Sequence, residues 1–265
     1  MLNKNNTDYL LKAKEIIHSH DLEPYVQSLL KLWIDTSTPS LGHGFGHVLD
    51  VAVESYELAI LNKYEKPQEL FIAGLLHDVY RPAEGKDGQE DHHQRSYELA
   101  LMILEGLKSD AKFVTKFKYA LSDEWKQGEN LDEFASLLFL GDKSCLDRRM
   151  ADAYAWASNK YCEINGKDLV YKSALSTMNG FVHYFHKIIP MLLKIDLKGK
   201  DKIIDNFVEI VSSLRNQHIM DPSGKDFQKY LETEAKKFSN KEKKYLSEFI
   251  KREKDINKLL GSFDN

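Results

Sequence analysis

The sequence has few of the residues that interrupt or cross-link a chain. It contains 2 cysteines, 6 prolines and 14 glycines in 265 residues. Cys145 and Cys162 form no C-x-x-C pair, so we expect no disulfide framework and a reducing compartment. The scarcity of proline and glycine leaves long uninterrupted segments, which favours long regular secondary-structure elements.

Long apolar runs and an excess of basic charge are also absent. The longest apolar runs are short, such as LFIAGLL at 70–76, whereas a membrane-spanning helix needs about 20 apolar residues. The N-terminal MLNKNNTDYLL lacks the apolar segment and cleavage site of a secretory signal. The net charge is −4, from 37 Lys and Arg against 41 Asp and Glu, but binders of nucleic acid or acidic membranes are usually basic. We therefore expect a cytoplasmic protein whose partners include neither a membrane nor an extended nucleic acid.

Apolar residues recur at three- and four-residue spacing through most of the chain, which predicts amphipathic helices. Two helices are expected between residues 9 and 34, with a break near Pro24. Further helices are expected at 47–64, 70–79, 95–107, 110–125, 131–145 and 147–163. Alternating patterns rich in β-branched residues are missing, so we predict an all-α protein.

The composition changes after about Pro222, where the chain becomes rich in Lys and Glu. With 42% hydrophobic residues the chain can build a sizeable core. We predict one domain at 1–220 and a polar C-terminal helical extension at 221–265. The expected role of the extension is a pair of solvated helices against the main body. The alternative is a hairpin that binds a partner or forms a homo-oligomer.

Four short segments hold residues that suit chemistry: HGFGH at 43–47, LLHDVYR at 75–81, EDHHQRS at 90–96 and LGDKSCLDRR at 140–149. Taken singly, each is better explained as a surface residue or a helix end. Together they place carboxylates at the ends of strongly apolar runs, where an isolated charge costs several kcal/mol to bury. A divalent cation held between the inner faces of a helical bundle would offset that cost. Mixed imidazole and carboxylate ligands suit Mn²⁺, Fe²⁺, Zn²⁺, Co²⁺ or Ni²⁺.

The order of these residues resembles a known family. His47 is followed by His77–Asp78 and then by Asp142, with LLHD and LGDK as the surrounding elements. This order resembles that of the HD-domain superfamily of metal-dependent phosphohydrolases. HGFGHVLDV resembles the HDxxHxxRV opening of a bacterial subfamily, although Gly44 and Asp50 stand where that subfamily often has Asp and Arg. The resemblance covers roughly residues 15–215. It implies an HD-domain helical bundle with additional C-terminal helices.

The resemblance also implies roles for individual residues. The expected ligands of one divalent metal ion (Mn, Fe, Co, Ni, Zn or Mg) are His47, His77, Asp78 and Asp142. Candidates for a general acid or base are Glu90, Asp91 and His92. Candidates for binding the substrate or its phosphates are His43, Arg81, His93, Arg95 and Lys143.

Some of these roles have alternatives. His92 or His93 stands where some superfamily members have a second-metal ligand and others a substrate-contacting residue. Arg148 and Arg149 suit phosphate binding or simply a solvated helix start. Many two-metal members carry a further His in the region that here reads KYALSDEWKQGEN. The absence of that His argues against a full second metal site, although Asp123 could substitute.

The expected activity is hydrolysis of a small phosphorylated substrate, with a nucleotide as the first candidate. In the implied mechanism, a hydroxide on the metal attacks phosphorus and a nearby acid protonates the leaving oxygen. One alternative is a di-iron oxygenase built on the HD fold. Another is a non-catalytic HD module that binds a nucleotide.

Overall fold

The computed structural model describes residues 6–36, 45–80, 92–122, 124–127, 131–145, 188 and 191–203. Within this part of the chain every regular element is a helix and no strand occurs, which confirms the predicted all-α class. The elements are α1 (Asn6–Ser19), α2 (Glu23–Thr36), α3 (Phe45–Leu61), α4 (Pro67–Leu76), α5 (His92–Gly106), α6 (Ala111–Leu121), a 3₁₀ helix (Glu124–Lys126) and α7 (Glu133–Ser144).

The chain divides into two compact units. The first unit comprises Met1–Cys145, Leu197–Gly199 and Arg252–Asn265, and the second comprises Leu146–Asp196 and Lys200–Lys251. Helices α1 to α7 all belong to the first unit. The predicted helix at 147–163 and the predicted domain boundary at 220–221 lie outside the described residues.

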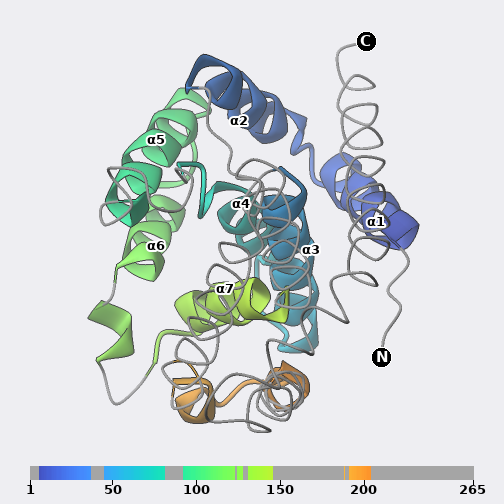
Figure 1. Cartoon of the computed structure of the whole chain (residues 1–265), viewed down its shortest axis with the longest axis vertical. Helices are drawn as coiled ribbons and strands as arrows, with labels where there is room; N and C mark the ends of the chain where they lie inside the picture. Colours follow the sequence, from blue (N-terminus) through green and yellow to red (C-terminus); the bar gives the residue numbers. More distant parts are fainter. Residues whose placement is uncertain are drawn as a thin grey trace, which may run out of the picture. The chain divides into compact units, whose positions relative to one another are not determined.

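Helix α3 is the central helix of the first unit and contacts α1, α4 and α7 (Figure 1). A helix that is apolar on all sides has to be surrounded by other elements. Twelve residues of α3 are buried, among them Val48, Leu49, Val51, Ala52 and Val53. Because these residues are nearly consecutive, their side chains point to all sides of the helix. Helix α4 is buried continuously over Glu69–Leu76. The core of the unit is therefore the α3–α4 pair.

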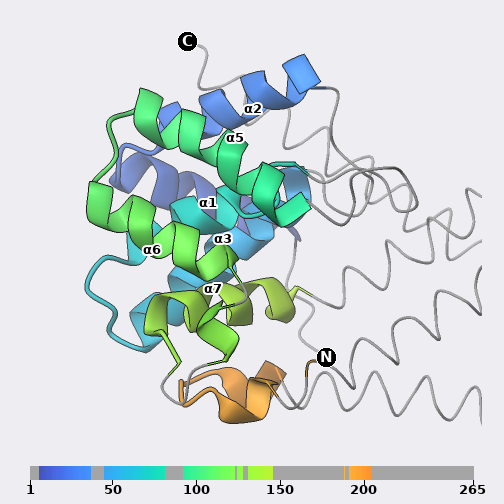
Figure 2. The same ribbon diagram turned by 90° about the vertical axis from the view of Figure 1, so that its left-hand side faces the viewer.

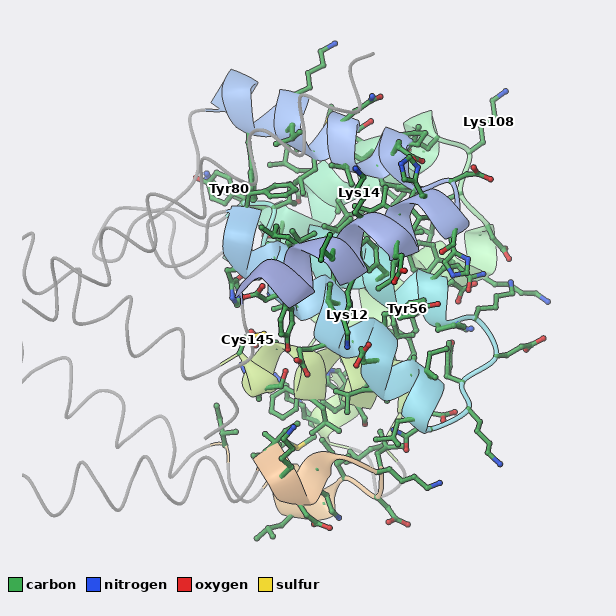
Figure 3. All side chains as sticks on the ribbon, turned by 90° about the vertical axis from the view of Figure 1, so that its right-hand side faces the viewer. Lys12, Lys14, Tyr56, Tyr80, Lys108 and Cys145 are labelled. Carbon is green, nitrogen blue, oxygen red and sulfur yellow. The ribbon has the colours of Figure 1, made fainter. Side chains whose placement is uncertain are left out.

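The remaining helices cover this pair. Helix α2 contacts α4 and α5, and α5 lies beside α6, which in turn contacts α7 (Figure 2). On another side of α3, Lys12 Nζ of α1 donates a hydrogen bond of 2.8 Å to Glu57 Oε1 (Figure 3). The predicted break near Pro24 is confirmed, because α1 ends at Ser19 and α2 begins at Glu23. Pro24 itself lies in the first turn of α2, where proline is tolerated. None of the described helices combines the length and hydropathy required to cross a membrane.

Two glycines allow α4 and α7 to approach α3 closely. A Cβ added to Gly74 of α4 would lie 2.5 Å from Ala52 Cα and 2.6 Å from Ala52 N, both in the backbone of α3. A Cβ added to Gly141 of α7 would overlap Ser55 Oγ of α3. Because the neighbouring atoms at Gly74 belong to backbone, they cannot rotate away. These contacts fix α4 and α7 against α3 next to His77 and Asp142.

Replacing Gly74 with Ala is expected to lower the free energy of unfolding by about 1–3 kcal/mol, because the added methyl group forces α3 and α4 apart in a packed core. Urea unfolding followed by circular dichroism measures the change. Gly106→Ala is the matched control, since a Cβ there has nothing within 4 Å. Equal stability of Gly74→Ala and wild type would contradict the close approach.

Candidate metal centre

His47 lies in the first turn of α3, two residues after the helix begins at Phe45. Its side chain is only 1% exposed, and both α4 and α7 pack against α3. An imidazole in so apolar a helix is normally buried only together with polar partners. The partners come from the ends of two other helices.

His77 and Asp78 directly follow the last residue of α4, Leu76, and both are buried. His77 continues the helical backbone as the C-cap residue, with φ −62° and ψ −34°. Its Nδ1 lies 2.8 Å from the Gly74 carbonyl oxygen. A carbonyl oxygen only accepts hydrogen bonds, so this contact assigns the proton to Nδ1 and leaves a lone pair on Nε2 of the neutral ring. That buried Nε2 has no hydrogen-bond partner among the described residues.

Asp142 lies in the last turn of α7. The side chain of Asp132 caps the start of this helix by accepting a 2.8 Å hydrogen bond from Ala135 N. The close contact at Gly141 holds the other end against α3. As a result, Asp142 Oδ1 lies 3.6 Å from His47 Nε2 and 3.9 Å from His77 Nε2.

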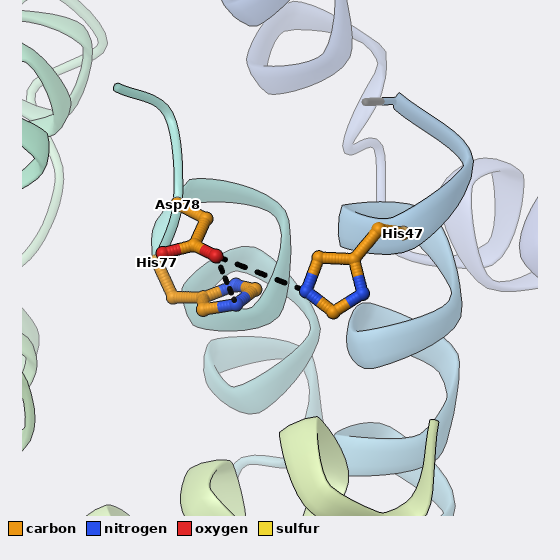
Figure 4. Close-up of side chains that lie close together, drawn as sticks. All are labelled: His47, His77 and Asp78. Atoms are coloured by element: carbon orange, nitrogen blue, oxygen red, sulfur yellow. Dashed lines mark ion pairs between the residues drawn. The ribbon is translucent and has the colours of Figure 1, made fainter. Parts of the chain in front are cut away.

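Asp78 completes a group in which two imidazoles and two carboxylates converge. Its Oδ2 lies 3.5 Å from His77 Nε2 and 3.8 Å from His47 Nε2 (Figure 4). The two imidazole rings meet edge-on, with centroids 5.4 Å apart and planes inclined at 64°. The ligand atoms of His47, His77 and Asp78 all lie within 4.8 Å of one another. The structure therefore brings together the four residues that the sequence singles out as ligands.

The spacing of these atoms suits a bound cation. Nitrogen–oxygen distances of 3.5–3.9 Å exceed that of a hydrogen bond. Ligand atoms about 2.1 Å from a metal ion and at tetrahedral angles would lie about 3.4 Å apart. The lone pair on His77 Nε2 is the donor that a metal requires, and the second ring nitrogen is already fixed by Gly74. The buried cluster of His47, His77 and Asp78 can hold a metal ion.

The ends of two helices add to the attraction for a cation. Asp78 follows the C-terminus of α4, and Asp142 lies at the C-terminus of α7. The C-terminus of a helix carries a partial negative charge, so a carboxylate is disfavoured there and a cation is favoured. Two carboxylates and two helix ends thus concentrate negative potential at one buried point.

Lys143 is the one predicted substrate-binding residue that directly contacts this group within the described residues. Its side chain is buried, and Nζ forms an ion pair with Asp142 Oδ2. The ammonium also lies 5.2 Å from the centre of the Phe139 ring. The two oxygens of Asp142 are therefore divided: Oδ1 faces the imidazoles and Oδ2 faces Lys143.

Arg95 is held at the edge of this region. Its Nη1 donates a hydrogen bond of 3.0 Å to Tyr80 Oη, and its guanidinium lies 5.3 Å from the centre of the Tyr80 ring. Tyr80 follows Asp78 by two residues. His92 and His93 open α5, but their side chains are outside the described part. Outside the described residues altogether lie His43, Arg81, Glu90, Asp91, Asp123, Arg148 and Arg149.

Two polar groups near the centre are not among the predicted site residues. Asp50 is buried on α3 and follows His47 by three residues, a spacing that places both on one face of the helix. Cys145 is buried just after α7. Burial raises the pKa of the Cys145 thiol well above its usual value, and the charges of Asp50, Glu54 and Asp142 raise it further. The thiol therefore stays protonated at neutral pH. The three-residue spacing from His47 could have predicted from the sequence that Asp50 lies near the centre.

Comparison of this chain with protein-family models, with curated proteins and with solved structures finds no match.

Replacing His77 with Ala is expected to weaken the binding of Mn²⁺ by more than about 100-fold. Mutating a residue that only orients a ligand lowers metal affinity by up to about 100-fold, and loss of a ligand itself should cost more. The reason is the loss of the lone pair on Nε2. Isothermal titration of metal-free protein measures the affinity. His18→Ala is the control, because His18 is exposed and its Nδ1 pairs with Glu23 at 2.7 Å. Unaltered Mn²⁺ binding by His77→Ala would refute the site.

Proposed function

We propose that this protein is a metal-dependent phosphohydrolase of small phosphorylated molecules, with a nucleotide as the first substrate to test. The observation that carries the proposal is the convergence of the buried His47, His77 and Asp78 with the partly exposed Asp142. The resemblance of their order to the HD-domain superfamily supports it further, since that resemblance implies these four residues as ligands.

The four side chains would hold one divalent cation, and Mn²⁺ is the first to test. Such an ion supplies Lewis acidity, which acidifies water and polarises a phosphoryl oxygen. Gly74 holds the proton of His77 on Nδ1, so that the ring binds as a neutral ligand. The burial of His47, His77 and Asp78 excludes bulk water and strengthens every charge interaction at the site.

A bound cation would make the site compatible with an anionic substrate. A divalent ion would balance the Asp78 and Asp142 carboxylates, and the Lys143 ammonium would offset the nearby charge of Asp50, so the cation itself is the positive group that a substrate would meet. A phosphate group carries the complementary charge. We assign Lys143 to the charge-balancing role. Arg95, which is held by Tyr80, would contact the phosphates from the edge of the site.

Residues 90–92, which end at the first residue of α5, would supply the proton-transfer groups. Ser96, in the second turn of α5, is hydrogen-bonded to the backbone of Tyr80, two residues after Asp78. This contact ties the helix that begins at His92 to the segment that carries a ligand. We propose Glu90, Asp91 and His92 as candidates for protonating the leaving oxygen. Substrate contacts are proposed for His43, Arg81 and His93.

Replacing Asp142 with Asn is expected to lower kcat about 100- to 1000-fold, as for the loss of one preorganised electrostatic group. The change removes a negative ligand and leaves the Lys143 ammonium without its counter-charge. The assay measures phosphate and pyrophosphate released from a nucleotide panel with Mn²⁺, Mg²⁺ or Co²⁺. It also distinguishes removal of one phosphate from removal of pyrophosphate.

Asp110→Asn is the matched control for this charge-neutralising change. Asp110 is the exposed N-cap of α6, and Asn caps a helix as well as Asp does. Its activity should equal that of wild type. The proposal fails if no substrate is hydrolysed with any of the three metals. Two iron ions per chain after anaerobic purification would favour the di-iron oxygenase alternative, and tight nucleotide binding without turnover would favour the non-catalytic module.

A further inference from the structure

The ligands at the centre lie at places where helices give the least support. Asp78 is beyond the last residue of α4, and His47 is in the first turn of α3. Terminal turns lack part of the backbone hydrogen bonding of a helix interior and open more readily. Val79 N, for example, is linked to Leu76 O by a long contact of 3.4 Å. Accurate placement of the ligands therefore needs contacts from other elements.

Trp33 of α2 provides such a contact on the α4 side. Its indole Nε1 donates a hydrogen bond of 2.6 Å to the carbonyl oxygen of Val79, the residue directly after Asp78. Trp33 is 6% exposed and Val79 is fully buried. A buried carbonyl that loses its donor has no water to replace it, so this bond strongly constrains the chain at that point.

The same side chain also contacts the segment that carries His47. The Trp33 ring meets the Phe45 ring edge-on, with centroids 5.7 Å apart and planes at 89°. Phe45 is the first residue of α3 and is buried. Trp33 thus touches both ligand-bearing segments, one through its N–H group and the other through its ring.

Ser96 of α5 holds the same exit from α4 on another side. Tyr80 N donates to Ser96 Oγ at 3.1 Å, and Ser96 Oγ donates to Tyr80 O at 2.9 Å. Ser96 is completely buried. Consecutive residues, Val79 and Tyr80, are therefore each fixed by a side chain from a different helix.

We infer that Trp33 is a positioning residue of the metal centre, and that Ser96 completes this clamp on Val79 and Tyr80. The inference rests on the proposed metal site and concerns the geometry of its ligands. Trp33 sets the position of Asp78 relative to His47 without itself binding the ion. Partners that orient a ligand in this way typically change metal affinity by about 10- to 100-fold when they are removed.

Trp33→Phe tests the inference, because it removes the indole N–H and keeps an aromatic ring against Phe45. Trp125→Phe is the matched control: Trp125 is equally buried, packs edge-on against Phe139, and its Nε1 has no hydrogen-bond partner among the described residues. Metal-free proteins are titrated separately with Mn²⁺ and with Zn²⁺ in a calorimeter, and thermal unfolding is recorded without metal.

The expected result is a dissociation constant raised about 10-fold or more in Trp33→Phe and unchanged in Trp125→Phe. A role in stability alone would lower the unfolding temperature of Trp33→Phe and leave its metal affinity unchanged, which would overturn the inference. Should Trp33→Phe fail to fold, Ser96→Ala decides, with weakened metal binding expected and unchanged binding refuting the clamp. Failure of the wild-type protein to bind either metal would overturn the proposed metal site itself, and this inference with it.

Discussion

The hydrogen bond from His77 Nδ1 to the Gly74 carbonyl connects the packing of the helices to the chemistry of the centre. Gly74 is also the residue at which the backbone of α4 approaches Ala52 of α3. One residue therefore sets the distance between the helices of His47 and His77 and selects the ring nitrogen that keeps a lone pair. Without this bond either nitrogen of His77 could carry the proton, and Nε2 would not always have the free lone pair that a metal ion requires.

Burial strengthens the charge interactions at the centre, but it also adds the free-energy cost of removing charged groups from water. Carboxylates taken out of water need compensation, and here each lies at the negative end of a helix, which makes the need greater. The surrounding core keeps the imidazoles and carboxylates about as far apart as ligands of one ion. Such a group is costly as a purely structural feature, and this cost is the physical argument for a cation.

The sequence predicts much of the fold and the types of residue at the centre. Helical periodicity predicted the all-α class and a break near Pro24, and the structure confirms both, because α1 ends at Ser19 and α2 begins at Glu23. Carboxylates after apolar runs predicted where Asp78 and Asp142 would be buried or nearly so. The contacts of Trp33 with Val79 and Phe45 could not be predicted, because they depend on which face of α2 meets α4 and α3. The roles of the four ligands stay a prediction.

The ion pair between Lys143 and Asp142 bears on whether the protein needs a metal ion in order to fold. Small zinc-binding domains remain unfolded without their metal, because they have little core of their own. Here the core around α3 and α4 is extensive, and Lys143 supplies part of the positive charge that the buried carboxylates require. The fold of this unit therefore does not depend on a cation. A metal ion would bind to a chain that is already folded, and its occupancy would follow the concentration of free ions around the protein.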